Sequence, residues 1–238
     1  RYLDARFMIQ GSTDTQGNAT VHLIGERAET GSHSQTELRT FLGRDNEFNV
    51  LTTAFHEAIE SQRARAILLS GEAGVGKSRL CDEVEAAITS DHPDTVVWRA
   101  KGDEMTKGAA FHLVSQLIRQ GSGCAPDDEL ETRQNKLLER MRELFEEEHV
   151  QGLAEFLGEI SGTPFPIDSG SMQLAAARDN SMLMGDQIRR SWESFLAAQV
   201  SHHPTLLILE DLQWGDLSSI RLIDGALRNL TQGRWMLL

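Results

Sequence analysis

The chain has 238 residues, a length that allows one full domain with a remnant or two small domains. It carries 36 Asp and Glu residues against 23 Lys and Arg residues, for a net charge of −13, and it has no basic run, so nucleic acid is disfavoured as its main partner. Cys81 and Cys124 are too few for a disulfide framework or a four-cysteine zinc site, and no apolar stretch approaches the ~20 residues that span a bilayer. These features favour a cytoplasmic protein that binds neither nucleic acid nor membrane.

The N-terminal part differs from the rest of the chain. Residues 7–10 and 19–24 are rich in apolar and β-branched residues and are separated by a polar, glycine-containing turn, which predicts two strands. Residues 28–37 are small and polar and show no periodicity, as is typical of a linker. We therefore predict the C-terminal remnant of an upstream domain at 1–27, this linker, and a main domain at 38–238.

Strand and helix patterns alternate along the main domain. Continuous apolar runs at 66–70, 95–98 and 205–209 are typical of strands buried on both faces of a parallel sheet. Apolar residues with helical spacing predict helices between these runs, at 48–59, 77–89, 109–119, 137–145, 186–200 and 217–230. The alternation predicts an α/β fold with a parallel sheet and a large helical insertion between the second and third of these strands.

The strongest motif directly follows the first buried strand. It fits the pattern G-x-x-x-x-G-K-[ST], the phosphate-binding P-loop. Its glycines let the backbone N–H groups curl toward phosphate oxygens, and the following helix adds its positive N-terminal end. Lys77 is expected to reach the β- and γ-phosphates, and Ser78 to offer its hydroxyl to Mg²⁺. The nucleotide-binding candidates in the loop are Gly71, Glu72, Ala73, Gly74, Val75, Gly76, Lys77, Ser78 and Arg79.

The third buried strand leads into two acids, Glu210 and Asp211, and resembles a Walker B strand. Mg²⁺ takes oxygen ligands, often through water, and a second acid can orient or deprotonate the attacking water. Because side chains alternate along a strand, the two acids are predicted to point to opposite sides. We expect Glu210 near Mg²⁺ and Asp211 near the γ-phosphate, although Asp usually comes first in this motif, which leaves the division of labour open. The catalytic candidates are thus Lys77, Glu210 and Asp211, and the metal candidates are Ser78, Glu210 and Asp211.

The turn after these acids carries further polar and aromatic side chains. Asp216 or Ser218 is predicted to cap the next helix. Trp214 is predicted to belong to the core rather than to stack on a ligand. Gln213, two residues after Asp211, is a candidate sensor of the γ-phosphate.

Three stretches in order resemble the STAND branch of the AAA-related ATPases. They are residues 42–44, 71–80 and 206–216, where the family pattern is roughly VGRE, GEAGIGKSRL and LEDLHWAD. The resemblance covers about residues 38–238. The departures from the pattern are Asp45 for Glu, Gln213 for His and Gly215 for Ala.

The resemblance implies a P-loop three-layer sandwich with strand order 5-1-4-3-2. The strand that begins at Trp235 would then lie between the P-loop strand and the Walker B strand, and since the chain stops there we expect a domain truncated at its C-terminus. The family's Gly-Arg motif lies near the adenine, so Leu42, Gly43 and Arg44 are nucleotide-binding candidates on the base side.

The resemblance also implies a function. It implies an ATP-dependent regulatory switch that binds ATP or ADP with Mg²⁺, hydrolyses slowly and meets protein partners, or itself, through regions outside this chain. Residues 21–26, followed by the linker and the Leu-Gly-Arg motif, resemble the junction at which a class III adenylate/guanylate cyclase domain precedes such an ATPase. Two other readings stay open: a scaffold module that holds nucleotide without hydrolysing it, and a P-loop phosphotransferase.

Overall fold

The structure is a computed structural model that describes residues 7–13, 19–26, 43–106, 108–166 and 171–238. The chain divides into two compact units, Arg1–Gly43 and Arg44–Leu238. In the first unit, β1 (Phe7–Thr13) and β2 (Ala19–Glu26) pair antiparallel, which confirms the two strands predicted there. The predicted linker at 28–37 lies outside the described residues.

The second unit is built on a four-stranded parallel sheet. Its order is β3 (Arg65–Ala66), β6 (Trp235–Leu237), β5 (Thr205–Glu210) and β4 (Val96–Lys101). The strand at Trp235 thus lies between the strand before the P-loop and the strand that ends in Glu210, and the expected order of these four strands is confirmed. Parallel strands present their carboxyl ends at one edge, where ligands of α/β sheets bind. Here that edge brings together the P-loop, Lys101 and Glu210, and the last two are register partners.

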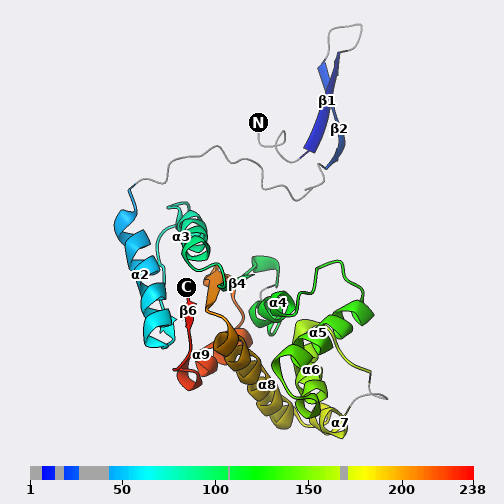
Figure 1. The fold of residues 1–238 in the computed structure, drawn as a ribbon. Coiled ribbons are helices and arrows are strands. Elements are labelled where there is room, and N and C mark those ends of the chain that lie inside the picture. Colours follow the sequence, from blue (N-terminus) through cyan, green and yellow to red (C-terminus); the bar gives the residue numbers. More distant parts are fainter. Residues whose placement is uncertain (1–6, 14–18, 27–42, 107, 167–170) are drawn as a thin grey trace. The chain divides into compact units, whose positions relative to one another are not determined.

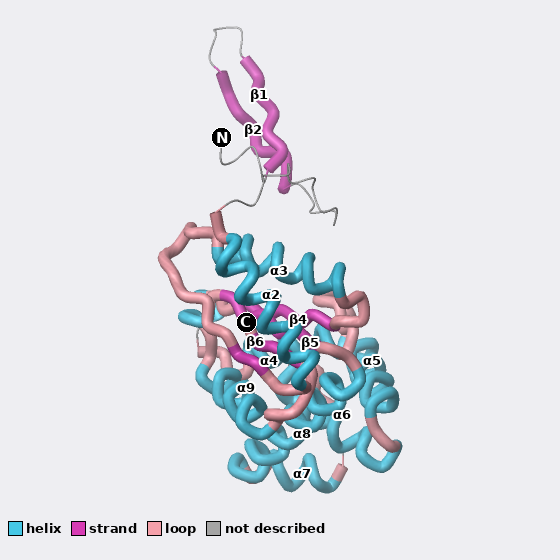
Figure 2. The backbone as a smooth tube through the Cα atoms, turned by 60° about the vertical axis from the view of Figure 1, so that its left-hand side comes forward, coloured by secondary structure: helices cyan, strands magenta, loops and turns pink. Residues whose placement is uncertain are grey.

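Helices cover both faces of the sheet (Figure 2). On one face, α2 (Asp45–Ser61) packs on β3 and β6, and α3 (Lys77–Asp91) packs on β5. On the other face, α4 (His112–Gly121) packs on β4 and contacts α9 (Leu217–Asn229). The three-layer α/β/α sandwich is therefore as predicted.

The helical insertion between β4 and β5 is large, as predicted, and it contains more helices than the sequence indicated (Figure 1). After α4 come α5 (Leu130–Leu144), α6 (Glu147–Ser161), α7 (Met172–Arg178) and α8 (Ser181–His202). The sequence did not predict α6 or α7, and α8 begins five residues before its predicted start, because the Asn180 side chain caps it at Met182 and Leu183. Two short 3₁₀ turns, at Glu104–Thr106 and Leu212–Trp214, flank the carboxyl ends of β4 and β5.

Aromatic packing ties this insertion to the sheet. The ring of Trp98 on β4 stacks on Phe195 of α8 with centroids 5.4 Å apart. Both side chains are buried in the main apolar core of the unit. Gly121, the last residue of α4, allows this helix to pack closely against both rings. A Cβ at this position would lie 2.5 Å from the Trp98 ring and 2.8 Å from the Phe195 ring.

The apolar run at 66–70 does not form the doubly buried strand that its composition predicts. β3 comprises Arg65–Ala66 alone, both exposed, and Leu68 is 77% exposed. The reason is position: β3 pairs with β6 on one side, and within the described part of the chain no strand pairs with its other side.

The described helices include none that is long and apolar enough to cross a membrane.

Candidate functional site

The P-loop connects β3 to α3 and has the backbone that phosphate binding requires. Gly74 and Gly76 have φ angles of +81° and +91°, a region that residues with a Cβ rarely adopt. Gly76 is the N-cap of α3, and no side chain caps that helix end. The first N–H groups of α3 therefore lack an intrahelical partner and can bind an anion, assisted by the helix dipole.

The Lys77 side chain folds back over this loop. Its ammonium donates hydrogen bonds to the carbonyl oxygens of Gly71 at 2.8 Å and Glu72 at 2.9 Å. The remaining loop candidates, Ala73 and Val75, are exposed on the same turn. The positive charge of Lys77 is thus held beside the P-loop, whose backbone N–H groups already favour an anion.

Ser78 and Glu210 meet across the site. The Ser78 hydroxyl, in the first turn of α3, donates a 2.6 Å hydrogen bond to Glu210 Oε2 at the end of β5. Hydroxyl and carboxylate oxygens are ligands that Mg²⁺ accepts, with phosphate and water oxygens completing its shell. Among the described residues no group of three or more His, Cys, Asp or Glu side chains could hold a metal by itself. The residues therefore fit an Mg²⁺ ion that the nucleotide helps to bind.

Arg99 is a member of this site that sequence reasoning missed. It lies on β4 and contacts three carboxylates: Glu85 through Nε at 2.7 Å, Asp82 through Nη2 at 2.7 Å, and Glu210 through Nη1 at 3.3 Å. A single Arg inside a strand pattern carries no sequence signal for such contacts, because its partners lie 17, 14 and 111 residues away.

Asp211 does not follow the strand alternation that the sequence predicted. β5 ends at Glu210, and Asp211 has a φ of +53°, so the two-residue period does not extend to it. Its carboxylate forms an ion pair with Lys101 at 3.4 Å and accepts a 3.2 Å hydrogen bond from the Gln213 amide. Glu210 and Asp211 thus contact different residues. The turn at Asp211, rather than the alternation of side chains along β5, separates the two carboxylates.

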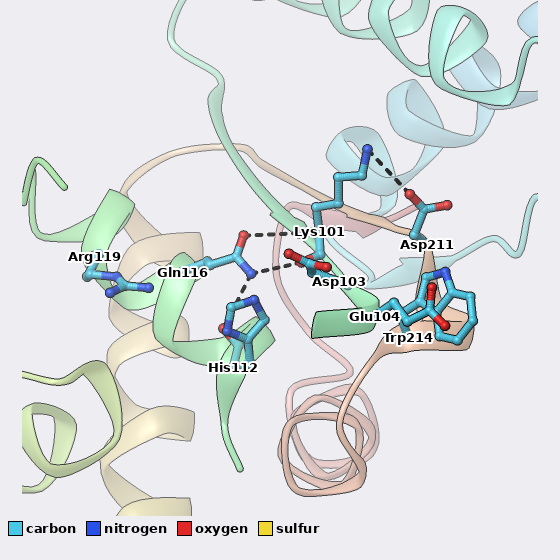
Figure 3. Close-up of a pocket in the computed structure, with 9 residues that line it drawn as sticks. Lys101, Asp103, Glu104, His112, Gln116, Arg119, Asp211 and Trp214 are labelled. Carbon is cyan, nitrogen blue, oxygen red and sulfur yellow. Dashed lines mark hydrogen bonds and ion pairs between the residues drawn. The ribbon is translucent and has the colours of Figure 1, made fainter. Parts of the chain in front are cut away.

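A cavity of about 530 Å³ lies beside Asp211 at the carboxyl ends of β4 and β5 (Figure 3). The Lys101 side chain extends along it toward Asp211, and the Gln116 amide holds both the N–H and the C=O of Lys101. Trp214 lines the cavity and is half-buried, so its prediction as a core residue is wrong: the 3₁₀ turn carries it to the rim instead. The other lining residues are Gly102, Asp103, Glu104, His112 and Arg119.

Asp216 caps α9, as one of the two residues predicted for this role. Its Oδ1 accepts hydrogen bonds from the N–H groups of Ser219 at 2.7 Å and Phe111 at 2.8 Å, and its Oδ2 accepts one from the Leu113 N–H. Burial raises the pKa of the Asp216 carboxyl, but these hydrogen bonds outweigh it, so the pKa lies below its ordinary value.

The remaining candidates are Arg44, Gly43, Leu42 and Arg79. The Arg44 guanidinium donates a 2.9 Å hydrogen bond to the Val75 carbonyl oxygen and pairs with Glu47. Gly43 is exposed with a φ of +83°, and Leu42 lies outside the described residues. Arg79 points along α3 to Glu83.

A parallel sheet of this order, with a glycine loop leading into a helix whose serine meets the acid at the end of β5, defines a P-loop NTPase. A family model described as AAA ATPase domain matches residues 40–238, so the chain belongs to that family and is a nucleotide-binding ATPase module. Searches of the curated proteins and of the solved structures found no match.

Proposed function

We propose that the chain is the ATP-operated switch module of a multidomain signal-transduction protein, and that it binds ATP with Mg²⁺ and hydrolyses it slowly. The observation that carries the proposal is the 2.6 Å hydrogen bond between Ser78 and Glu210. It joins the phosphate-binding helix to the acidic strand end, so two of the three metal candidates, Ser78 and Glu210, lie at one point.

Each candidate residue has a task in this proposal. The backbone of the P-loop and Lys77 bind the phosphates, while Ser78 and Glu210 hold Mg²⁺. When bound, Mg²⁺ neutralises charge on the phosphate oxygens. Asp211 orients the attacking water, and Gln213, which donates to its Oδ1, steadies that carboxylate.

Arg44 acts on the base side of the nucleotide in this proposal. Its hydrogen bond to the Val75 carbonyl oxygen supports the loop backbone. A role for Leu42, Gly43 and Arg44 on the base side is supported by the likeness of their motif to the family pattern.

The signalling role is supported by the likeness of the three motifs to STAND ATPases. An upstream class III cyclase domain is supported by residues 21–26 and the sequence that follows them. We further propose a cytoplasmic location, with protein partners or self-association through regions outside this chain.

The test is ATP turnover and bound-nucleotide content of the purified protein, with Lys77→Ala as the variant. Lys77→Ala should abolish nucleotide binding, and Asp211→Asn should abolish turnover while binding remains. Lys136→Ala, which removes a cation paired with Asp128 in the helical insertion, is the matched control. ATP affinity unchanged by Lys77→Ala would refute the site, and tight binding without turnover would favour the non-hydrolysing scaffold.

The cavity beside Asp211 supports phosphoryl transfer as a second candidate function. It has room for a small acceptor next to a carboxylate that could serve as its base. The two activities differ in product: hydrolysis releases one inorganic phosphate per ADP, whereas transfer yields ADP without free phosphate once an acceptor is supplied.

A further inference from the structure

We infer that Arg99 is the positioning residue of the metal site: it orients the Glu210 carboxylate so that one oxygen faces Ser78. The inference rests on the proposed function, because it assigns the residue that shapes the proposed Mg²⁺ site. Arg99 has no hydrogen bond to the P-loop, to Lys77 or to Ser78 among the described contacts, and it acts on the metal site through Glu210.

The guanidinium is fixed before it reaches Glu210. Two of its nitrogens donate at 2.7 Å to Glu85 and Asp82, which lie one turn apart on α3. The guanidinium is planar and its donors form a rigid fork, so these two contacts set its plane. The third nitrogen, Nη1, then points to Glu210 Oε1 at the longer distance of 3.3 Å.

The two oxygens of Glu210 are thereby distinguished. Oε1 accepts from Arg99, and Oε2 accepts from Ser78 at 2.6 Å. A carboxylate held at both oxygens cannot rotate freely, and its side chain is only 18% exposed. The oxygen that a metal at Ser78 would meet is therefore preset by Arg99.

Charge gives Arg99 a second effect on the same group. It is the cation shared by three carboxylates, those of Asp82, Glu85 and Glu210. Without it, mutual repulsion would drive Glu210 away from α3 and from Ser78. Lysine would keep the charge but not the fork, since its ammonium is a compact point charge.

The experiment compares the Mg²⁺ dependence of ATP turnover in the wild type, Arg99→Gln and Arg99→Lys. We expect the Mg²⁺ concentration for half-maximal turnover to rise about tenfold in Arg99→Gln, as for other residues that orient a metal ligand. It should also rise in Arg99→Lys, by a smaller factor. Binding of a fluorescent ADP analogue in EDTA should stay within twofold of the wild type, which a general structural role would not predict.

Arg228→Gln is the matched control, because it removes the same charge from the exposed pair with Asp224 on α9. If Arg99→Gln does not fold, Glu85→Gln and Asp82→Asn each remove one anchor of the guanidinium and should raise the same Mg²⁺ concentration. Two results would overturn the inference while leaving the proposed function intact. One is that the folded variants need the same Mg²⁺ concentration as the wild type. The other is that they lose affinity for the ADP analogue in EDTA by the same factor by which the required Mg²⁺ concentration rises. A wild-type protein that binds no nucleotide would instead overturn the proposed function, and the inference with it.

Discussion

The backbone N–H of Phe111 donates a 2.8 Å hydrogen bond to the carboxylate of Asp216, 105 residues later in the chain. Phe111 precedes α4 and Asp216 precedes α9, and the same carboxylate also accepts from Leu113 and Ser219. One buried side chain therefore caps two helices on one face of the sheet, and it does so five residues after Asp211. The turn that carries the candidate catalytic acid is tied to α4 by this carboxylate.

Replacing Asp216 should destabilise the fold. Asp216→Ala removes a helix cap and leaves three N–H groups without their acceptor, so we expect a loss of about 2–4 kcal/mol in the free energy of unfolding. Urea denaturation at pH 7 measures it. Asp224→Ala, which removes an exposed carboxylate from α9, is the control, and equal midpoints for the two variants would contradict the role.

The same carboxyl makes stability depend on pH. Its pKa is lowered in the folded protein, so its contribution is complete above the unfolded-state pKa of about 3.9 and is lost as pH falls through the folded value. The stability difference between the wild type and Asp216→Asn should therefore be largest at neutral pH and shrink below about pH 4. A difference that stays constant from pH 7 to pH 3 would show that the charge of Asp216 contributes nothing.

Gly102 allows a close approach that positions Asp211. A Cβ at this position would collide with the Asp211 carbonyl oxygen and lie 3.0 Å from the Gly215 nitrogen. Gly102→Ala should displace the turn and lower ATP turnover by about tenfold or more, while ADP binding at the P-loop changes little. Gly185→Ala is the matched control, because nothing lies within 4 Å of a Cβ there. Unchanged turnover in Gly102→Ala would mean that the position of Asp211 is not critical.

Arg44 should contribute to affinity through the loop rather than through the metal. Arg44→Gln removes the hydrogen bond to the Val75 carbonyl oxygen, worth about 1 kcal/mol, so we expect a several-fold loss of affinity for ADP and ATP alike. Titration with a fluorescent ADP analogue, with and without Mg²⁺, measures this. Arg65→Gln, which breaks an exposed pair with Glu57, is the control. A loss seen only in the presence of Mg²⁺ would place Arg44 in a different role.

The parts of this protein that the sequence predicts are those that short-range patterns control. The P-loop glycines, the helix that begins at Lys77 and the strand that ends at Glu210 are contiguous in sequence, so their motifs are visible without a fold. The sheet order followed from the likeness of the three motifs to a known family, and the structure confirms it.

What the sequence did not predict depends on distant contacts. Arg99 gains its partners only when β4 lies beside β5 and below α3. Asp211 has a left-handed backbone, so the two-residue alternation of β5 does not extend to it. The turn that follows places Trp214 at the rim of the cavity. Leu68 has the composition of a buried strand, yet it is exposed because burial requires a neighbouring strand.

The most direct test of the account is a double-mutant cycle between Ser78 and Glu210 on ATP affinity in the presence of Mg²⁺. Ser78→Ala and Glu210→Gln should each weaken binding, and the double variant should lose little more than the worse single variant, with a coupling free energy of about 1 kcal/mol or more. In EDTA the coupling should vanish, because both residues act on the metal. Additive losses in Mg²⁺, or the same coupling without metal, would contradict a shared Mg²⁺ site at the point where the P-loop helix meets β5.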